Sequence, residues 1–333
     1  MNLPTRESLR LQWTRQALAD PDATLERAST DASFRSYWRT RSATRSWIVM
    51  DAPPDKEDIR PWLDIAYRLA RAGLHVPDIQ AADPERGFVL MEDLGERLLL
   101  PELSESSADR LYGAALDALL RMQRDADAEG LPLYDEARLV TEMELMPEWL
   151  LKRHLGQVQE CEEWDVIESA FRALVTSARL QPQAFVHRDF HSRNLLLTRN
   201  DSPGIVDFQD AVLGPVTYDL VSLLRDCYIR WPEARVVAWV EAYRQRLVAA
   251  GIPTLGEEAF LRAFDLMGLQ RHIKVLGIFC RLWYRDGKAG YLQDLPLVWD
   301  YVRTVGRRYP DIAPLVDLLE RRIGDRDLTV PRQ

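Results

Sequence analysis

Two short stretches near the middle of the chain place polar residues in a fixed order. "VHRDFHSRN" spans residues 186–194 and "IVDFQD" spans 205–210. The first stretch puts Asp189 five residues before Asn194, and the second puts Asp207 at the end of an apolar run. The segments "NLLLT" and "PGIVDF", joined across the turn-rich "RNDSPG", predict a β-hairpin. We expect this hairpin to bring Asp207 back beside Asn194.

This order of polar residues fits metal-assisted phosphoryl transfer. Transfer from ATP needs a divalent cation to neutralise the phosphates and a carboxylate aimed at the attacking hydroxyl. Magnesium prefers oxygen ligands and keeps several waters, so one Asp carboxylate and one Asn carbonyl are a sufficient protein contribution. The spacing matches the catalytic loop of kinases. We therefore expect Asp189 to be the base or hydroxyl-orienting group, and Asn194 and Asp207 to bind Mg²⁺.

A polar loop in which Asp189 only caps a turn is the alternative, and the sequence around the motif argues against it. The first part of the chain is rich in predicted strands, and a helix that Gly73 would cap lies among them. From Glu105 onward, helical periods dominate except at 184–210. We predict a nucleotide-binding lobe at 1–92, joined at "MEDLG" to a catalytic and substrate-binding lobe at 93–333. The expected strands are 24–29, 34–40, 46–52, "VPDIQAAD" and "GFVLMED".

Composition narrows the class of partner. Of the 333 residues, 47% are apolar and 29% charged, which is ordinary for a globular protein, and no apolar run reaches membrane-spanning length. The start of the chain predicts an amphipathic helix rather than a secretory signal. A net charge of −9 argues against non-specific nucleic-acid binding. We expect a cytoplasmic protein that acts on a small molecule. We expect it neither to bind a membrane nor to need an obligate protein partner. The widely spaced cysteines indicate neither disulfides nor zinc: Cys161, Cys227 and Cys280.

The motifs together resemble those of the aminoglycoside phosphotransferase and choline kinase family. The similarity extends over nearly the whole chain, with "ASTDASFRSYWR" as the phosphate-covering loop and "FVLMEDLG" as the strand and hinge. In "GPVTYDLVSLLRD", the resemblance implies that Asp219 starts a helix and braces the catalytic loop. It also implies an α+β, bilobal protein-kinase-like fold with a small sheet-rich N-terminal lobe and a larger, mainly helical C-terminal lobe. ATP and Mg²⁺ are the implied cofactors.

The same resemblance implies nucleotide-binding residues in the loop and the hinge. Family members hold adenine mainly through backbone groups of the hinge. The residues implied here are Ser33, Phe34 and Arg35 in the loop, and Met91 and Glu92 in the hinge.

One position departs from the family pattern. Kinase-like folds usually place a Lys on the third strand to hold the α- and β-phosphates. Here Met50 stands in the corresponding position, and no Lys precedes Lys56. Arginine presents a planar fork suited to phosphate oxygens, and the phosphate-covering loop contains Arg35 and Arg39. We expect Arg35 to supply the missing charge, with Lys56 as the other candidate.

Softer similarities suggest the acceptor. "TDASFRSYWR", "IVMDAPPDKED" and "ELMPEWLLKRHL" resemble segments of bacterial anomeric kinases that phosphorylate N-acetylmuramate and N-acetylglucosamine in peptidoglycan recycling. Carboxylates accept sugar hydroxyls, and one arginine among Arg225, Arg271 and Arg281 is expected to meet a lactyl carboxylate. The predicted substrate-binding residues are His191, Glu142, Glu148 and Arg225.

Two other functions remain open at this point. An aminoglycoside or choline-type phosphotransferase would take a cationic acceptor, for which a cleft lined by carboxylates or aromatic rings is needed. A nucleotide-binding pseudokinase is motivated by Met50 in the lysine position. The resemblance of the softer segments favours the amino-sugar kinase.

Overall fold

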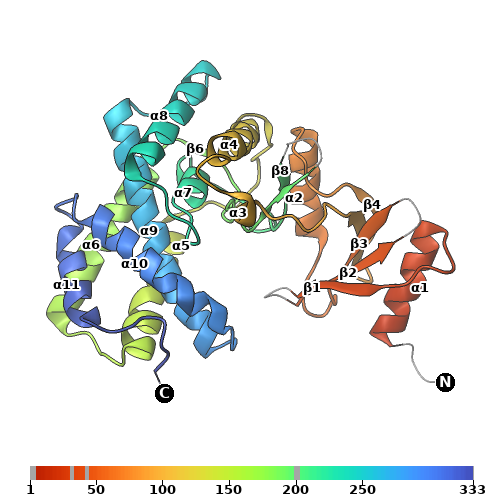
Figure 1. Cartoon of the computed structure of the whole chain (residues 1–333), viewed down its shortest axis with the longest axis horizontal. Helices are drawn as coiled ribbons and strands as arrows, with labels where there is room; N and C mark the ends of the chain where they lie inside the picture. Colours follow the sequence, from red (N-terminus) through yellow and green to blue (C-terminus); the bar gives the residue numbers. More distant parts are fainter. Residues whose placement is uncertain (1–4, 31–33, 42–44, 199–202, 333) are drawn as a thin grey trace. The chain divides into compact units, whose positions relative to one another are not determined.

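The computed structural model of the chain describes residues 5–30, 34–41, 45–198 and 203–332. It divides into two compact units, the first made of 1–127 and 193–209, and the second of 128–192 and 210–333 (Figure 1). The first unit contains the large sheet and the second is mainly helical, so the α+β class is confirmed. The division into 1–92 and 93–333 concerns which parts bind nucleotide and substrate, and it stays a prediction.

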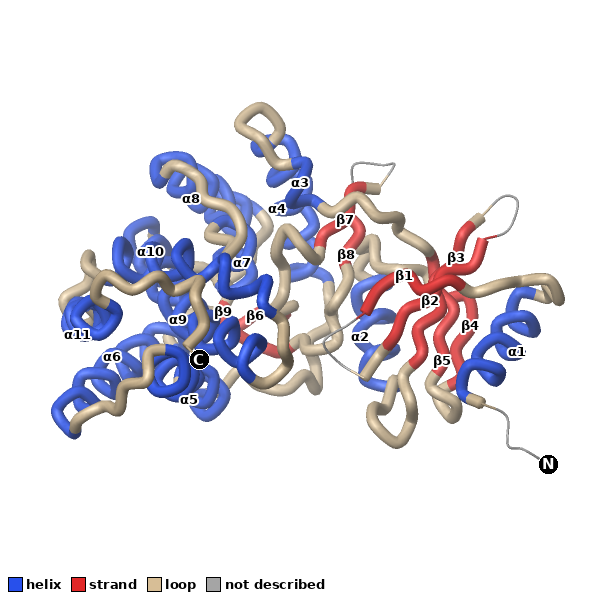
Figure 2. Tube along the Cα trace, turned by 60° about the horizontal axis from the view of Figure 1, so that its bottom comes forward, coloured by secondary structure: helices blue, strands red, loops and turns tan. Residues whose placement is uncertain are grey.

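The first unit is built on a five-stranded antiparallel sheet with strand order β1-β2-β3-β5-β4 (Figure 2). One face is covered by α1 (Arg6–Leu18), where Trp13 packs against Val49, Phe88 and Leu90. The rings of Trp13 and Phe88 lie 5.5 Å apart. The expected strands are confirmed as β1 (Glu26–Thr30), β2 (Ser36–Arg41), β3 (Ser46–Asp51), β4 (Ile79–Asp83) and β5 (Phe88–Glu92).

Strand β3 presents different residues to the two faces of the sheet. Val49 packs on the α1 side, so its neighbour Met50 points to the opposite face. Met50 is fully buried between Tyr37 on β2 and Val89 on β5. The predicted lysine position is therefore on the third strand, as expected, and an apolar side chain fills it.

Beyond α1 and the sheet, the described part of the first unit also contains three helices and a β-hairpin. Helix α2 (Arg60–Arg71) has a proline in its first turn and is followed by Gly73 at φ 74°, a conformation that favours glycine. The predicted hairpin is confirmed, because β7 (Leu195–Leu197) and β8 (Pro203–Ile205) pair antiparallel. Residues 199–202 of its turn lie outside the described residues. Two further helices are α3 (Leu99–Glu102) and α4 (Ala108–Asp125).

The second unit is organised around α9 (Glu257–Tyr284), a helix of 28 residues that packs against helices from several parts of the chain. At Gly277 a Cβ atom would lie 2.2 Å from the backbone carbon of Leu145, so this close packing requires glycine. Strands β6 (Gln183–Val186) and β9 (Val212–Pro215) pair beside the helices. The other elements are α5 (Glu136–Met143), the π-helix η1 (Met146–His154), α6 (Cys161–Arg179), α7 (Tyr218–Leu224), α8 (Glu233–Ala249), the 3₁₀ segment η2 (Ala289–Asp294), α10 (Leu295–Gly306) and α11 (Ala313–Ile323). Within the described parts of the chain, no helix combines the length and apolarity needed to cross a membrane.

Candidate active site

The first unit contains a cavity of about 560 Å³ on the face of the sheet that carries Met50. Side chains of β2 and β3, including Tyr37 and Ile48, form one wall, and the segment after β5 forms another. The structure brings four predicted site residues to this cavity from distant parts of the sequence. They are Met91, Glu92, Asn194 and Asp207.

Asn194 and Asp207 lie side by side at the end of the β7–β8 hairpin. The Asn194 amide Nδ2 donates to Asp207 Oδ2 at 3.2 Å, and the backbone N–H of Val206 donates to the carbonyl of Asn194 at 3.2 Å. Gln209 donates to the other Asp207 oxygen at 2.9 Å. Asp207 has a φ of 65°, a left-handed conformation that costs a non-glycine residue about 1 kcal/mol or more and is concentrated at functional sites.

The donor set fits magnesium better than a metal that needs a protein cage. In the described residues, no group of three or more His, Cys, Asp and Glu side chains is placed to hold a metal ion. Magnesium is usually bound by one or two carboxylates together with waters and substrate phosphates, which suits a single Asp–Asn pair. A half-turn of the Asn194 amide would present its oxygen in place of the Nδ2 group that now faces Asp207.

The segment after β5 is held by an ion pair that spacing alone did not predict. Arg39 on β2 donates to both carboxylate oxygens of Asp93, at 2.7 and 3.1 Å, and it also pairs with Glu96. Burial would raise the pKa of Asp93, but hydrogen bonds from Arg39, from Ser46 and from the Gly95 backbone lower it. Arg39 lines the cavity, yet its charge is already matched by these carboxylates.

The predicted residues of the phosphate-covering loop are less closely tied to the cavity. Ser33 lies outside the described residues, and the Phe34 side chain is 66% exposed. Arg35 is buried, with Nε 3.5 Å from Glu57 Oε1. Among the described residues, the cavity lining includes neither Phe34 nor Arg35. The nucleotide-binding role of all three stays a prediction.

In the second unit, the loop predicted to be catalytic (187–192) follows β6 and is braced by a carboxylate from α7. Asp219 accepts the backbone N–H groups of His187 at 2.7 Å and Arg188 at 3.0 Å. The bracing role that the resemblance implied for Asp219 therefore has a direct geometric basis. Burial raises the pKa of Asp219 to about 7, although these two hydrogen bonds act in the opposite direction. At the end of the loop, Asp226 accepts the backbone N–H of Ser192 at 3.0 Å.

Asp189 is half-buried within this loop, and its surroundings favour the ionised form. Burial would raise the pKa of Asp189, but the positive charges of His191, Lys274 and His187 outweigh it and lower the pKa. A carboxylate held ionised in this way accepts a hydrogen bond from a hydroxyl and orients it. Lys274 is not among the residues predicted from the sequence, although a lysine inside the apolar run of α9 is an unusual signal.

The four predicted substrate-binding residues have different environments. The His191 ring meets the edge of Tyr228 at 5.5 Å. Glu148 is exposed on η1 and pairs with Lys152 at 2.9 Å. Glu142 is partly buried and is bonded to several neighbours. These environments do not test whether the residues contact a substrate. The roles of His191, Glu148 and Glu142 therefore stay predictions.

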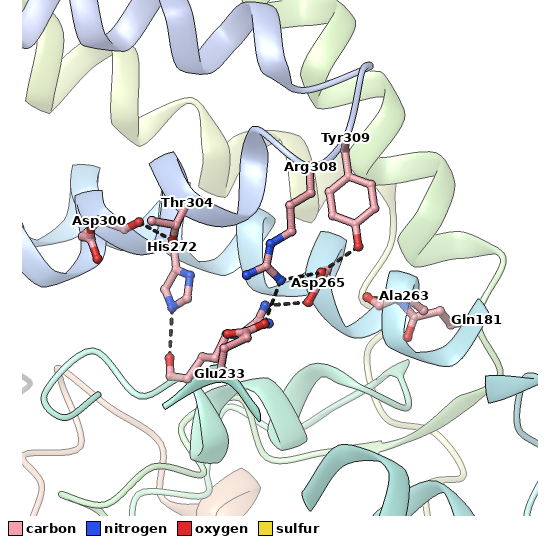
Figure 3. Close-up of polar contacts among 10 residues, drawn as sticks. Gln181, Glu233, Ala263, Asp265, His272, Asp300, Thr304, Arg308 and Tyr309 are labelled. Carbon is pink, nitrogen blue, oxygen red and sulfur yellow. Dashed lines mark hydrogen bonds and ion pairs between the residues drawn. The ribbon is translucent and has the colours of Figure 1, made fainter. Parts of the chain in front are cut away.

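The fourth, Arg225, belongs to a buried cluster of ion pairs. Its side chain is 1% exposed, with Nη1 2.7 Å from Asp265 and Nη2 2.8 Å from Glu233. Figure 3 shows Asp265 bonded also to Tyr309, and Glu233 bonded to Arg308. The guanidinium stacks over Phe264. Because almost no atom of Arg225 is accessible to a sugar, we do not keep it among the substrate-binding residues and assign it to the packing of α7, α8 and α9.

Solved structures of kinase-like phosphotransferases share this fold. An ADP-bound aminoglycoside phosphotransferase has a TM-score of 0.59 and 17% identity, over 86% of this chain and 95% of its own. An ethanolamine kinase from Plasmodium vivax has a TM-score of 0.62 and 10% identity, over 96% of this chain and 92% of its own. At such low identity, these similarities define the fold class, a protein-kinase-like fold.

Sequence relatives define the family. The model of the phosphotransferase enzyme family matches residues 24–261, and the chain belongs to that family. A protein of Pseudomonas aeruginosa named N-acetylmuramate/N-acetylglucosamine kinase is 49% identical over 90% of this chain and 88% of its own length. A protein of the same name from Neisseria meningitidis is 40% identical over 95% of this chain and 96% of its own. The resemblance inferred from the motifs is confirmed.

Proposed function

We propose that this phosphotransferase uses ATP and Mg²⁺ to phosphorylate the anomeric hydroxyl of N-acetylmuramate, N-acetylglucosamine or both. The observation that supports this most is the cavity that gathers the segment after β5 together with Asn194 and Asp207. Relatives that are 40–49% identical over most of the chain carry the name of this sugar kinase. Peptidoglycan recycling is the process in which such a product would be used.

Each part of the proposed site has a stated task. The segment at Met91 and Glu92 binds the adenine, and Asn194 and Asp207 hold the cation that neutralises the phosphates. Asp189, ionised at neutral pH, accepts the hydrogen bond of the acceptor hydroxyl and fixes its direction of attack. An anomeric hydroxyl is more acidic than an ordinary alcohol, so orientation contributes more than the basicity of Asp189.

The carboxylate of N-acetylmuramate needs a cationic partner that N-acetylglucosamine does not. Of the three arginines considered above, Arg225 is enclosed by carboxylates, and Arg271 is buried with Nη1 3.0 Å from the sulfur of Cys227. Arg281 is half-buried, and its Nε has no hydrogen-bond partner among the described residues. It lies two helical turns after Lys274 and hence on the same face of α9. We assign the lactyl carboxylate to Arg281.

Two partly exposed tyrosines, Tyr228 and Tyr291, linked through the buried ring of Phe279, supply a surface for the sugar ring in this proposal. The ring of Tyr228 lies 5.5 Å from His191 and 6.2 Å from Phe279, which in turn lies 5.3 Å from Tyr291. Aromatic faces pack well against the apolar face of a pyranose while hydroxyls point to polar groups. The His191 prediction fits this arrangement as a residue that contacts the acceptor.

The experiment is ADP release with four acceptors: N-acetylmuramate, N-acetylglucosamine, kanamycin and choline. We expect turnover with one or both amino sugars and background rates with the two cations. Turnover with kanamycin or choline alone would reassign the acceptor. ADP release with none of the four, together with normal ATP binding, would favour the pseudokinase that Met50 suggested.

A further inference from the structure

Glu142 on α5 lies where side chains from three separated segments of the second unit converge. Its Oε2 accepts a hydrogen bond from the hydroxyl of Tyr134, and its Oε1 pairs with Arg188 and with Lys274, the latter at 3.0 Å. Lys274 Nζ also donates to the hydroxyl of Tyr218 at 3.3 Å. The Glu142 side chain is only 13% exposed. Both of its oxygens are therefore used inside the protein.

The charges in this cluster depend on one another. Burial would raise the pKa of Glu142, but Lys274 and Arg188 outweigh it and lower the pKa. Burial would lower the pKa of Lys274, but Tyr218 and Glu142 contribute to raising it. Removing the carboxylate would leave the buried Lys274 and the partly buried Arg188 without their shared counter-charge, which is costly in a low-dielectric interior.

Arg188 connects this cluster to the catalytic loop. Its φ is 77°, a left-handed conformation that a non-glycine residue keeps only when its surroundings hold it there. Asp219 holds its backbone N–H at 3.0 Å, while Glu142 holds its guanidinium. The residue immediately before Asp189 is thus fixed at its backbone by α7 and at its side chain by α5.

We propose that Glu142 is a positioning residue that sets the orientation of Asp189 through Arg188, rather than a residue that contacts the sugar. The inference rests on the proposed function, in which Asp189 aligns the acceptor hydroxyl. Small displacements of a group that aligns a reactant reduce turnover strongly, by about 100-fold for a shift of about 1 Å. Loss of the contact between Glu142 and Arg188 therefore reduces kcat and leaves the KM values largely unchanged.

The test is Glu142→Gln, which keeps the size of the side chain and removes its charge. With the acceptor that supports ADP release, kcat falls about 10- to 100-fold, while KM for sugar and for ATP changes less than about three-fold. Glu136→Gln is the matched control, because Glu136 lies on the same helix in an exposed pair with Arg179. A rise in sugar KM at unchanged kcat would show that Glu142 contacts the sugar and overturn the proposal.

A double-mutant cycle tests the route through Arg188. If Glu142 acts by holding Arg188, adding Glu142→Gln to Arg188→Gln reduces kcat by less than about three-fold further. Losses that multiply in the double variant would overturn this route. Arg188→Lys provides a second approach should Glu142→Gln fold poorly, because it keeps the charge but loses the planar fork, and it is expected to reduce kcat without raising KM.

Hydrogen exchange separates failure of this proposal from failure of the proposed function, because it needs no acceptor. In Glu142→Gln, the backbone amides of residues 187–189 are expected to exchange at least about ten-fold faster, with Glu136→Gln unchanged. Unchanged exchange at these amides would overturn the positioning role, whatever substrate the enzyme uses. Faster exchange in the variant, without sugar turnover in the wild type, would support the positioning role of Glu142 and refute only the assigned acceptor.

Discussion

The cavity of the first unit and the charged clusters of the second unit differ in the surroundings of their polar side chains. Asn194 and Asp207 line a cavity of about 560 Å³. In the second unit, Glu142 is paired with Arg188 and Lys274. Arg225 is paired with Asp265 and Glu233. Buried charges of this second kind are stable only when they are paired.

This difference separates two kinds of effect that a substitution can have. A side chain that faces the cavity contributes to affinity for what binds there, so its loss changes KM or metal dependence. A side chain that is paired inside the protein, as Glu142 is, contributes in our proposal to the geometry of the catalytic loop, so its loss is expected to change turnover. The predictions below test that separation, beginning with the largest expected effect.

Asp189→Asn is expected to have the largest effect, because in the proposed function Asp189 aligns the acceptor hydroxyl. We expect kcat to fall at least about 1,000-fold while ATP affinity stays within about two-fold, since the charge is needed at the acceptor hydroxyl. Steady-state ADP release and equilibrium binding of ATP measure the two quantities. A variant with wild-type kcat would show that Asp189 is not the orienting group.

Asp207→Ala is expected to be next, because it removes a negative charge that faces the cation. The apparent affinity for Mg²⁺ should weaken about 100-fold, and Asn194→Ala should weaken it less, because a neutral amide is lost. Titration of ATP-dependent activity with Mg²⁺ measures both variants against wild type. An unchanged magnesium dependence of the Asp207 variant would remove the hairpin from the cofactor site.

Arg281→Gln tests whether Arg281 binds the lactyl carboxylate of N-acetylmuramate. A charge-assisted hydrogen bond contributes about 1.5–3 kcal/mol, so KM for N-acetylmuramate should rise about 10- to 100-fold. KM for N-acetylglucosamine should stay within about two-fold, because that sugar has no carboxylate. Equal changes for the two sugars would contradict the assignment, and N-acetylglucosamine serves as the control within the same variant.

The fold was predictable because its determinants are local in sequence. The strands of the first unit, the helix ending before Gly73 and the hairpin around "RNDSPG" all follow from turn residues and apolar periods, and they are confirmed. Strand β9 was not predicted, because it lies beyond 184–210, the only segment after Glu105 that was expected to depart from helical periods. Its four residues form a strand by pairing with β6 across a long stretch of sequence, which no local pattern reveals.

The residues of the site were predictable only in part. A motif with fixed spacing identified Asn194 and Asp207, whose proximity depends on one short hairpin. Arg225 and Glu142 were chosen because charged residues can bind sugars, yet their burial and pairing depend on helices far apart in sequence. Composition does not show which charges pair internally. The contact of Lys274 with Glu142 could be found only from the packing of α9 against α5.

Arg35→Ala tests the prediction that Arg35 binds the phosphates of ATP. At this position, binding to a ligand and pairing inside the protein are the two alternatives. Arg35 is buried beside Glu57, but it belongs to the loop expected to cover the phosphates, and Met50 provides no charge on β3. If its guanidinium reaches the polyphosphate, Arg35→Ala raises KM for ATP about ten-fold, equal to about 1.4 kcal/mol, and leaves sugar KM unchanged. Lys56→Ala is the control, because Lys56 is exposed beside Asp55 and should change KM for ATP less. Loss of ATP use in Lys56→Ala with a near-normal Arg35→Ala would place the missing charge at Lys56, and Arg35 would then belong with the closed ion pairs.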